Sequence, residues 1–442
     1  MRRFFIFRII ALLFFFALLI PCVSHLSVSA SEDIPSASGV RYAYLYNIEY
    51  DKVIFQKGSV TDKISPAATV KIMSGLIAIK SLGARLDENV TITYNMIRNV
   101  EGYTVGFKVG DTVKVRDVLY GLVCGGGNDA AFIVAHLCSG SVEAFVEEMN
   151  AEAKAIGMEN TVYKNVTGID EHGMVITVKD IALLSTIAIK TPMFVEMSSA
   201  TEYRYKVLGS DEERVMSNRN ALISNYSAIG YKNKYVKGLN SGMTSNGGYC
   251  LSAYATDEKN SLLCIVMGGE VSLSGKISSY TVANELIDYG LNNFEYIKIA
   301  SKGDRISSLP VDLALPTNGS QTVMVDCVLD RDVYAYTSKN IDYKQALTYK
   351  VYFHNDMLVA PVEMDKVVGG VGIFYEGECL SEAKLVAAES VKESQLLVVL
   401  KQMKDIILSR RSILFIVTLI TFLTVFFLIR FIKRKRKYKK NR

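Results

Sequence analysis

Polar residues that could take part in catalysis gather in three short segments of this 442-residue chain. In the first, Lys71 follows Ala68 by three residues at the start of an apolar run. Three residues along a helix place two side chains on one face, which is the spacing required by a nucleophile and the amine that takes its proton. In the second, Asn128 follows a glycine loop that contains Gly126. The third segment is strand-like and contains Asn240, Ser241, Gly242 and Thr244.

The histidines and glycines exclude several other kinds of site. The chain has four histidines: His25 lies in the first thirty residues, and His136 lies on an apolar helix, as a core histidine would. No metal-ligand spacing links His172, His354 and the cysteines, so we expect no metal and no cofactor. The same scarcity argues against a Ser-His-Asp triad. The glycine loop is not followed by Gly-Lys-Ser/Thr, so a phosphate-binding loop is not indicated.

In their order and context, the three segments resemble the D-alanyl-D-alanine carboxypeptidases among the low-molecular-mass penicillin-binding proteins. The resemblance extends from about residue 38 to 390 and implies a serine-type DD-peptidase, β-lactamase-like α/β domain, with an antiparallel sheet flanked by helices. It further implies a small all-β, sandwich-like domain after it and peptidoglycan peptide stems as ligands. The segments that carry the resemblance are 66–73, 117–122 with 126–131, 168–170, 177–180, 236–244 and 248–251.

The first family motif, Ser-x-x-Lys, is incomplete in this chain. Ala68 stands where the family has its nucleophilic serine, whereas Lys71 is kept. Because Ala68 has no oxygen to attack a peptide carbonyl, an acyl-enzyme cannot form at that position.

The second and third motifs, Ser-x-Asn and Lys-Thr-Gly, are also altered. Gly126 replaces the serine that would pass a proton toward the leaving amine, and Asn128 is kept. Asn240 replaces the lysine suited to a substrate carboxylate, Ser241 replaces the threonine, and Gly242 is kept. With Thr244, these three residues would still form a substrate-binding strand.

Four other positions could supply a nucleophile, but each has a simpler interpretation. Ser65 is expected to cap the following helix, and Thr69 points about 100° away from position 68 around that helix. Cys124 lies near the glycine loop, but no cation nearby would lower the pKa of its thiol, so we interpret it as a buried structural cysteine. A second Ser-x-x-Lys, Ser381–Lys384, lies in a strand-rich region without the partner motifs and is attributed to chance.

Periodicity predicts a mixed α/β domain over residues 38–294. Residues 40–58 alternate as a hairpin would, and an apolar helix follows Ser65-Pro66 as far as Gly83. A strand-rich stretch extends from about residue 234 to 270. Helices are predicted at 116–124, 128–138, 141–156, 177–190 and 279–293.

Helical periodicity then disappears. Short alternating segments separated by Gly, Pro, Asn and Asp predict a small all-β domain over 296–388. Residues 389–411 are predicted to form an amphipathic linker helix that leads into an apolar C-terminal segment.

Both ends of the chain have the composition of membrane-targeting segments. Residues 1–30 have basic residues, an apolar core and Val28-Ser29-Ala30, as a cleaved signal peptide does. Residues 412–432 are predicted to be a single transmembrane helix, followed by a basic cytoplasmic tail at 433–442. We therefore expect a single-pass protein of the cell membrane whose bulk is extracytoplasmic and whose C-terminus is cytoplasmic.

The charge of the whole chain conceals an acidic exterior. The formal net charge is +5, but it becomes −9 for residues 31–409 once the three cations before and the eleven after are left out. An acidic exterior argues against nucleic acid as a partner. The six cysteines after the signal include no Cys-x-x-Cys pair, and we interpret most of them as buried small hydrophobic residues.

Two functions from different classes follow from these observations. The first is a pseudoenzyme of peptidoglycan metabolism that binds peptide stems or a cell-wall protein without acyl-enzyme chemistry. The alternative is an active DD-carboxypeptidase that removes the terminal D-alanine from a pentapeptide with a non-standard nucleophile. A β-lactamase-like hydrolase would lack the same serine and would gain nothing from the β domain.

Overall fold

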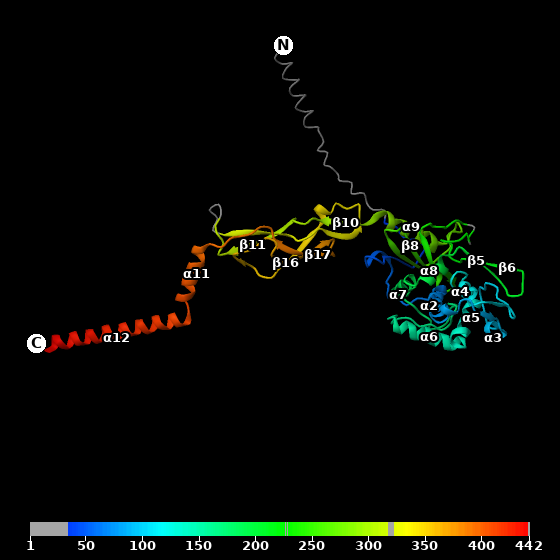
Figure 1. Cartoon of the computed structure of the whole chain (residues 1–442), viewed down its shortest axis with the longest axis horizontal. Coiled ribbons are helices and arrows are strands. Elements are labelled where there is room, and N and C mark those ends of the chain that lie inside the picture. Colours follow the sequence, from blue (N-terminus) through cyan, green and yellow to red (C-terminus); the bar gives the residue numbers. More distant parts are fainter. Residues whose placement is uncertain (1–33, 226, 228, 317–321, 441–442) are drawn as a thin grey trace, which may run out of the picture. The chain divides into compact units, whose positions relative to one another are not determined.

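The computed structural model describes residues 34–225, 227, 229–316 and 322–440, so the predicted signal peptide lies outside the described residues. The chain divides into two compact units (Figure 1). The first ends at Glu295 and the second begins at Tyr296, and each has its own hydrophobic core. The expected fold class, an α/β domain with an antiparallel sheet flanked by helices and then an all-β domain, is confirmed.

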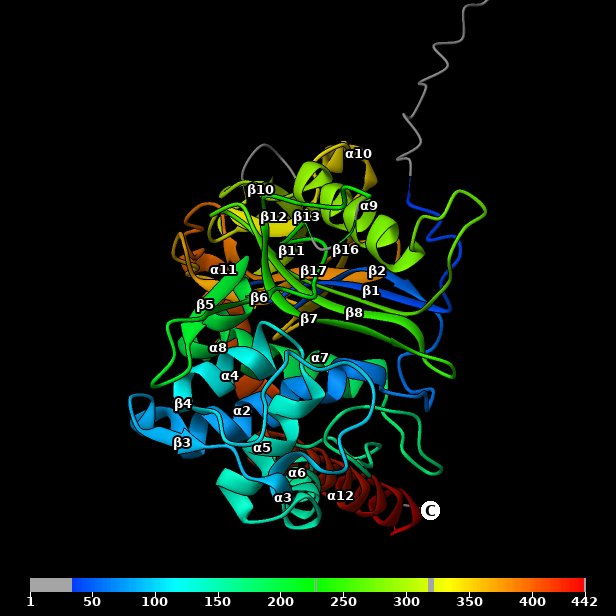
Figure 2. The ribbon, with the colours of Figure 1, turned by 90° about the vertical axis from the view of Figure 1, so that its right-hand side faces the viewer.

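The first unit is built on a five-stranded antiparallel sheet in the order β2-β1-β9-β8-β7. One face packs against α9 and the other against a group of helices around α2 (Figure 2). β1 and β2 are the predicted hairpin, and β7 is an edge strand. The bounds are β1 Tyr42–Asn47, β2 Lys52–Lys57, β7 Val236–Thr244, β8 Gly248–Thr256, β9 Ser261–Gly269 and α9 Ser278–Asn293.

The central helix α2, Val70–Leu82, follows a 3₁₀ turn η1, Ala67–Thr69. It is buried over most of its circumference, which explains why its sequence is apolar without a polar stripe. The prediction that Ser65 caps this helix is wrong, because Ser65 Oγ donates to Asp170 Oδ1 at 2.7 Å instead. A hydrogen bond to a carboxylate is stronger than one to a neutral group, and it holds the serine away from the helix end.

The helices predicted on both sides of the glycine loop are present as α4 and α5. Ser141 and Thr177 cap α6 and α7 by accepting hydrogen bonds from the Ala144 and Asp180 backbone N–H groups. The helix bounds are α3 Tyr94–Ile97, α4 Val115–Val123, α5 Asn128–Ser139, α6 Val142–Ala155, α7 Val178–Ile189 and α8 Pro192–Ser199. Two small two-stranded antiparallel sheets pair β3 Asn89–Thr91 with β4 Thr112–Lys114, and β5 Glu202–Lys206 with β6 Glu213–Ser217.

The second unit contains two sheets that share one core, as a sandwich does. The larger sheet has the order β14-β16-β17-β12-β11-β15, and the smaller pairs β10 with β13. A short helix, α10 Tyr343–Ala346, precedes β14. The strand bounds are β10 Phe294–Ala300, β11 Arg305–Asp312, β12 Val323–Leu329, β13 Val333–Ser338, β14 Thr348–Phe353, β15 Leu358–Val359, β16 Val367–Tyr375 and β17 Glu378–Ala387.

The predicted linker helix begins later than residue 389. Val391 forms a β-bridge with Val362 and is buried in the core of the second unit, so this stretch stays extended. The helix α11 then covers Gln395–Ile407, with Ser394 as its N-cap.

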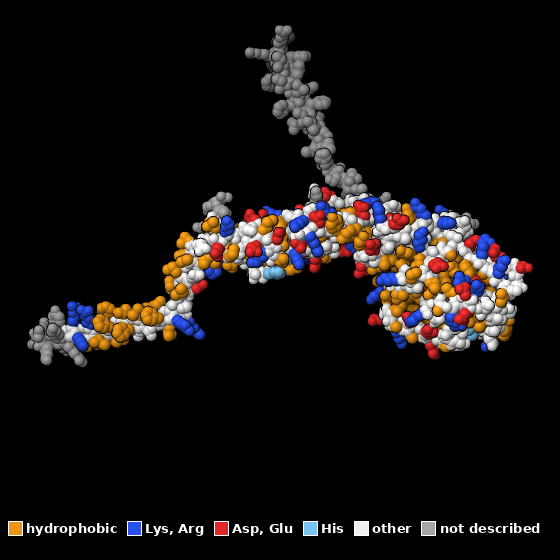
Figure 3. Space-filling model, viewed as in Figure 1, with side chains coloured by type: hydrophobic (Ala, Val, Ile, Leu, Met, Phe, Trp, Pro, Cys, Tyr) orange, Lys and Arg blue, Asp and Glu red, His pale blue; other side chains and the backbone are white. Residues whose placement is uncertain are grey.

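The last helix, α12, covers Arg410–Lys440. Its stretch Arg410–Arg434 is long and apolar enough to cross a membrane, and none of it is buried. Figure 3 shows apolar side chains along this helix with Lys and Arg side chains near its ends. Among the described helices, Ala67–Arg85 meets the same criteria but is largely buried, and two bent helix pairs meet them only when joined.

Candidate active site

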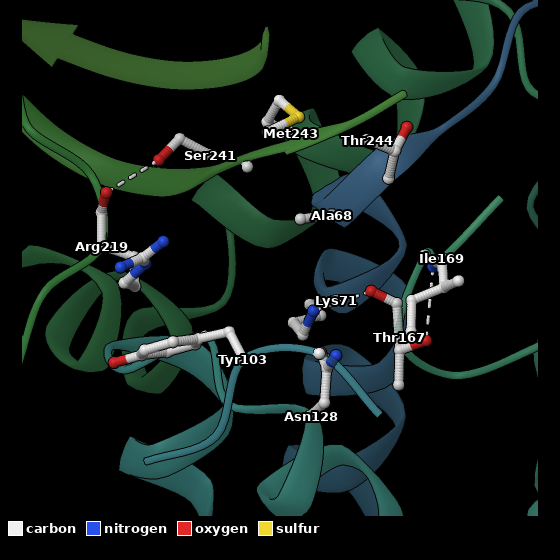
Figure 4. Close-up of a pocket in the computed structure, with 14 residues that line it drawn as sticks. Ala68, Lys71, Tyr103, Asn128, Thr167, Ile169, Arg219, Ser241, Met243 and Thr244 are labelled. Carbon is white, nitrogen blue, oxygen red and sulfur yellow. Dashed lines mark hydrogen bonds between the residues drawn. The ribbon is translucent and has the colours of Figure 1, made fainter. Parts of the chain in front are cut away.

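A cleft of about 150 Å³ lies in the first unit, where the start of α2, the loop before α5, the loop 165–170 and β7 meet (Figure 4). It brings together residues that are up to 176 positions apart in the sequence, from Ala68 to Thr244. The lining residues are Ala68, Lys71, Gly102, Tyr103, Gly126, Asn128, Thr167, Gly168, Ile169, Arg219, Ser241, Gly242, Met243 and Thr244.

Ala68 lies in η1 with its methyl group directed at β7. A Cβ atom built on Gly242 would lie only 2.3 Å from the Cβ of Ala68, so the helix start packs directly on the strand. Figure 4 shows Ala68 between Lys71 and β7. The position at which the family resemblance expects a nucleophile therefore holds a methyl group, which cannot attack a carbonyl.

Lys71 is 4% exposed, and its Nζ donates a hydrogen bond to the Thr167 carbonyl oxygen at 2.7 Å. The pKa of Lys71 is lowered to about 7, first by burial and then by the charge of Arg219, while Asp129 acts in the opposite direction. The Asp129 carboxylate forms no ion pair with this amine, because its oxygens accept four backbone hydrogen bonds. The donors are the N–H groups of Val105, Gly106, Phe107 and Ala130.

Asn128 and Gly126 hold the opposite wall of the cleft. Asn128 Nδ2 donates to the Glu101 carbonyl oxygen at 2.7 Å, which fixes the loop that carries Tyr103. Gly126 has a φ of +67°, a conformation that favours glycine, and a Cβ there would lie 3.3 Å from Arg219 Cγ. A serine at position 126 would be strained in this backbone.

The strand β7 contributes three of the four predicted residues to the cleft wall: Ser241, Gly242 and Thr244. Asn240 does not line the cleft. Its side chain is 7% exposed, and its Oδ1 has no hydrogen-bond partner in the described part of the chain. Ser241 Oγ donates to the Arg219 carbonyl oxygen at 3.1 Å and accepts from the Tyr280 hydroxyl at 3.0 Å.

The threonine hydroxyls of the cleft are also engaged. Thr244 Oγ1 donates to Asp170 Oδ1 at 2.9 Å, and Thr167 Oγ1 donates to Asn165 Oδ1 at 3.2 Å. The Asp170 carboxylate is a weak base, because its pKa lies below its ordinary value, and an amide oxygen is a weaker base still. Neither threonine is therefore arranged as a nucleophile.

The other candidate nucleophiles do not line the cleft. Ser65 donates to Asp170, and Thr69 Oγ1 donates to a backbone carbonyl of its own turn. Burial raises the pKa of Cys124 to about 12, so its thiol is not activated. Ser381–Lys384 lies on β17 of the second unit, where residues three apart point to opposite faces of the strand.

Arg219, Tyr103 and Thr167 line the cleft but are not predicted from the sequence, and Arg219 is the one of them that carries a charge. Its guanidinium carbon lies 4.1 Å from the centre of the Tyr103 ring, which places a second cation on the cleft wall. Asn218 and Asn220 fix its backbone, because Asn218 Nδ2 donates to two carbonyl oxygens near the end of α8 and Asn220 Oδ1 accepts from the Leu222 N–H. The only sequence signal is an arginine between two asparagines, which also fits an ordinary turn.

Two family profiles match the chain. That of the D-alanyl-D-alanine carboxypeptidase family matches residues 33–271, and that of the penicillin-binding protein 5 C-terminal domain matches residues 294–393. Among curated proteins, D-alanyl-D-alanine carboxypeptidase DacF of Bacillus subtilis is 24% identical over 369 residues, covering 83% of this chain and 89% of that one. D-alanyl-D-alanine carboxypeptidase DacC of Escherichia coli is 26% identical over 360 residues, covering 77% of this chain and 81% of that one.

Solved structures show the same fold. Penicillin-binding protein 5 of Haemophilus influenzae has a TM-score of 0.56 at 22% identity, covering 80% of this chain and 98% of that one. The carboxypeptidase DacD of Francisella tularensis has a TM-score of 0.59 at 21% identity, with coverages of 80% and 94%. Both the order of the two domains and their architecture are therefore shared with this group of proteins.

Proposed function

The chain belongs to the D-alanyl-D-alanine carboxypeptidase family, and on this basis we propose that it is a non-acylating member that binds peptidoglycan peptide stems in its cleft without cutting them. The observation that carries the proposal is Ala68, whose methyl group stands beside Lys71 where the family motif has its serine. The hydroxyls of Ser241, Thr244 and Thr167 have other partners, so no substitute is apparent on the cleft wall.

The groups of the cleft around Ala68 are held in place by hydrogen bonds and packing. Lys71 and Asn128 are buried and hydrogen-bonded, and Gly242 keeps the edge strand β7 against the helix start. An open edge strand can pair with an extended peptide, which is a common mode of peptide recognition. A binding function needs these features and does not need the nucleophile.

The location belongs to the same proposal. The apolar stretch of α12 and the cations that follow it support a single span with the two folded units outside and the tail in the cytoplasm. With this proposed topology, the cleft would lie on the side of the membrane where peptidoglycan stems are found.

The second candidate is a DD-carboxypeptidase with a non-standard nucleophile. It is favoured by Lys71, whose lowered pKa leaves part of the amine neutral at pH 7. Release of D-alanine from a pentapeptide at high protein concentration would support it, and a lack of release that persists over hours would exclude it.

The direct test is acylation of the full-length protein, in detergent, by a fluorescent penicillin, followed by intact mass. We expect no adduct on the natural protein and a slow adduct on Ala68→Ser, because the serine would regain Lys71 as its base. An adduct on the natural protein would refute the proposal, and mapping it would identify the nucleophile. Binding is tested separately with purified sacculi and synthetic stems.

A further inference from the structure

We propose that the cleft recognises stems that have already been trimmed, and that the terminal carboxylate of a tetrapeptide stem binds Lys71 in the space left by Ala68. This inference rests on the proposed function, because it names which stem the non-acylating cleft binds. The protein would then bind the product of a carboxypeptidase reaction.

The cleft is built for an anion. None of its fourteen lining residues is acidic, whereas Lys71 and Arg219 both contribute cations. Asp129 is the nearby carboxylate that acts on Lys71, and backbone N–H groups already occupy its oxygens. Within the described part of the chain, the Lys71 amine has one hydrogen bond, to the Thr167 carbonyl oxygen, so an ammonium at this position has donors left for a ligand.

Ala68 makes room for that anion next to the amine. In an active relative the motif places a serine hydroxyl at this position, between the lysine and the substrate carbonyl. Here the side chain ends at Cβ, which packs against Gly242 of β7. A carboxylate oxygen of the ligand can occupy the space of the absent hydroxyl and accept a charge-assisted hydrogen bond from Lys71.

The position of this site selects the length of the peptide. The carbonyl that a carboxypeptidase attacks belongs to the fourth residue of a pentapeptide stem. When the fifth residue has been removed, that carbonyl carbon carries the terminal carboxylate, which then lies at Ala68 and Lys71. The cation of the third motif, farther along the cleft, is replaced by Asn240, which does not line the cleft, so the carboxylate of a longer stem loses that partner.

The charged groups around Lys71 determine the pH dependence. They are Arg219 on the loop before β7, which lowers the pKa of the amine, and Asp129 on α5, which raises it. The Asp170 carboxylate, next to Thr244 of the cleft wall, is bonded to Ser65, Thr244 and Asn246. A bound carboxylate favours the protonated amine, whose pKa in the free protein is about 7. Tetrapeptide affinity is therefore greater at pH 6 than at pH 8.

The test is calorimetric titration of the full-length protein in detergent with three synthetic ligands: a stem tetrapeptide, its C-terminal carboxamide, and the pentapeptide. We expect the tetrapeptide acid to bind at least about tenfold more tightly than the carboxamide, as for a lost charge-assisted hydrogen bond. It should also bind more tightly than the pentapeptide. Lys71→Met should abolish the difference between acid and carboxamide, whereas Lys80→Met, on the exposed side of the same helix, should keep it.

The Ala68→Ser variant provides a second test. Its hydroxyl would occupy the space proposed for the ligand carboxylate, so tetrapeptide binding should weaken. Circular dichroism confirms that each variant is folded. Three results would overturn the inference and leave the proposed function intact. They are equal affinity for the tetrapeptide acid and its carboxamide, tighter binding of the pentapeptide than of the tetrapeptide, and a Lys71→Met variant that still prefers the acid to the carboxamide. Failure of every stem to bind would overturn both.

Discussion

The contact between Ala68 and Gly242 joins the helix that carries Lys71 to the edge strand of the sheet. The contact is tightly packed, because a Cβ atom added at position 242 would lie only 2.3 Å from the Ala68 methyl group. The segments that correspond to the first and third family motifs therefore pack directly against each other, and each sets the space available to the other.

Gly242→Ala is therefore expected to destabilise the protein by about 1–3 kcal/mol, the usual cost of inserting a methyl group into a tightly packed contact. Thermal or denaturant unfolding measures this change. Gly230→Ala is the matched control, because a Cβ there meets nothing within 4 Å and its stability should change by less than about 0.5 kcal/mol. Equal effects of the two substitutions would contradict the packing argument.

Lys71 is a residue whose burial costs stability at neutral pH. Its pKa is about 7 in the folded protein against an ordinary value of 10.5, so between these values the unfolded chain binds more protons than the folded one. The stability of the natural protein then rises as the pH increases from about 7 toward 10. Lys71→Met should be more stable than the natural protein at pH 7, and its advantage should shrink toward pH 10.

Unfolding curves at pH 7, 8.5 and 10 check this prediction, with the exposed Lys80→Met as a control that should show no such trend. If the difference in stability between Lys71→Met and the natural protein stays constant with pH, the Lys71 amine is not desolvated in the folded state.

At the scale of elements, Asp170 connects three segments of the first unit. Its carboxylate accepts hydrogen bonds from Ser65 before η1, from Thr244 at the end of β7, and from the Asn246 N–H. Burial acts to raise the pKa of Asp170, but these hydrogen bonds outweigh it and leave the pKa below its ordinary value. Asp170 therefore ties the end of the loop 165–170 to the segment before η1 and to the end of β7.

Asp170→Asn should cost about 1 kcal/mol and speed hydrogen exchange in the loop 165–170, because the charge-assisted bonds are lost. Since the folded pKa is lowered, this contribution is present at neutral pH and is lost as the pH falls below the ordinary value for aspartate. The difference in the free energy of unfolding between Asp170→Asn and the natural protein should therefore become smaller at acidic pH. Asp211→Asn, on the exposed turn between β5 and β6, is the control, and a similar effect there would refute the role of Asp170.

At the scale of the whole molecule, the apolar stretch of α12 is the proposed membrane anchor. Removal of residues 410–442 should move the protein from the membrane fraction to the soluble fraction, since the two folded units keep their cores without it. Cell fractionation checks this, with alkaline washing to separate a spanning segment from surface binding. Retention of the shortened protein in washed membranes would show that another segment anchors it.

Much of the fold could be predicted from the sequence because it depends on local periodicity. The apolar repeat of residues 70–82 and the glycines at 125–127 place α2, α4 and α5 correctly. The linker helix begins six residues later than predicted, at Gln395 and not at 389. Val391 is buried against the β core, which is a long-range contact that a local sequence pattern does not reveal.

The sequence by itself determined which chemical groups exist at the three motif positions: a methyl at Ala68, an amine at Lys71 and an amide at Asn240. These are covalent facts that no folding can change. The tertiary structure decided which groups share the cleft. It brings Arg219 and Thr167 to Lys71, buries Asn240 away from the cleft wall and pairs Ser65 with Asp170. Such contacts join segments about 100 to 150 residues apart, and packing and hydrogen bonding select them only when the whole domain closes.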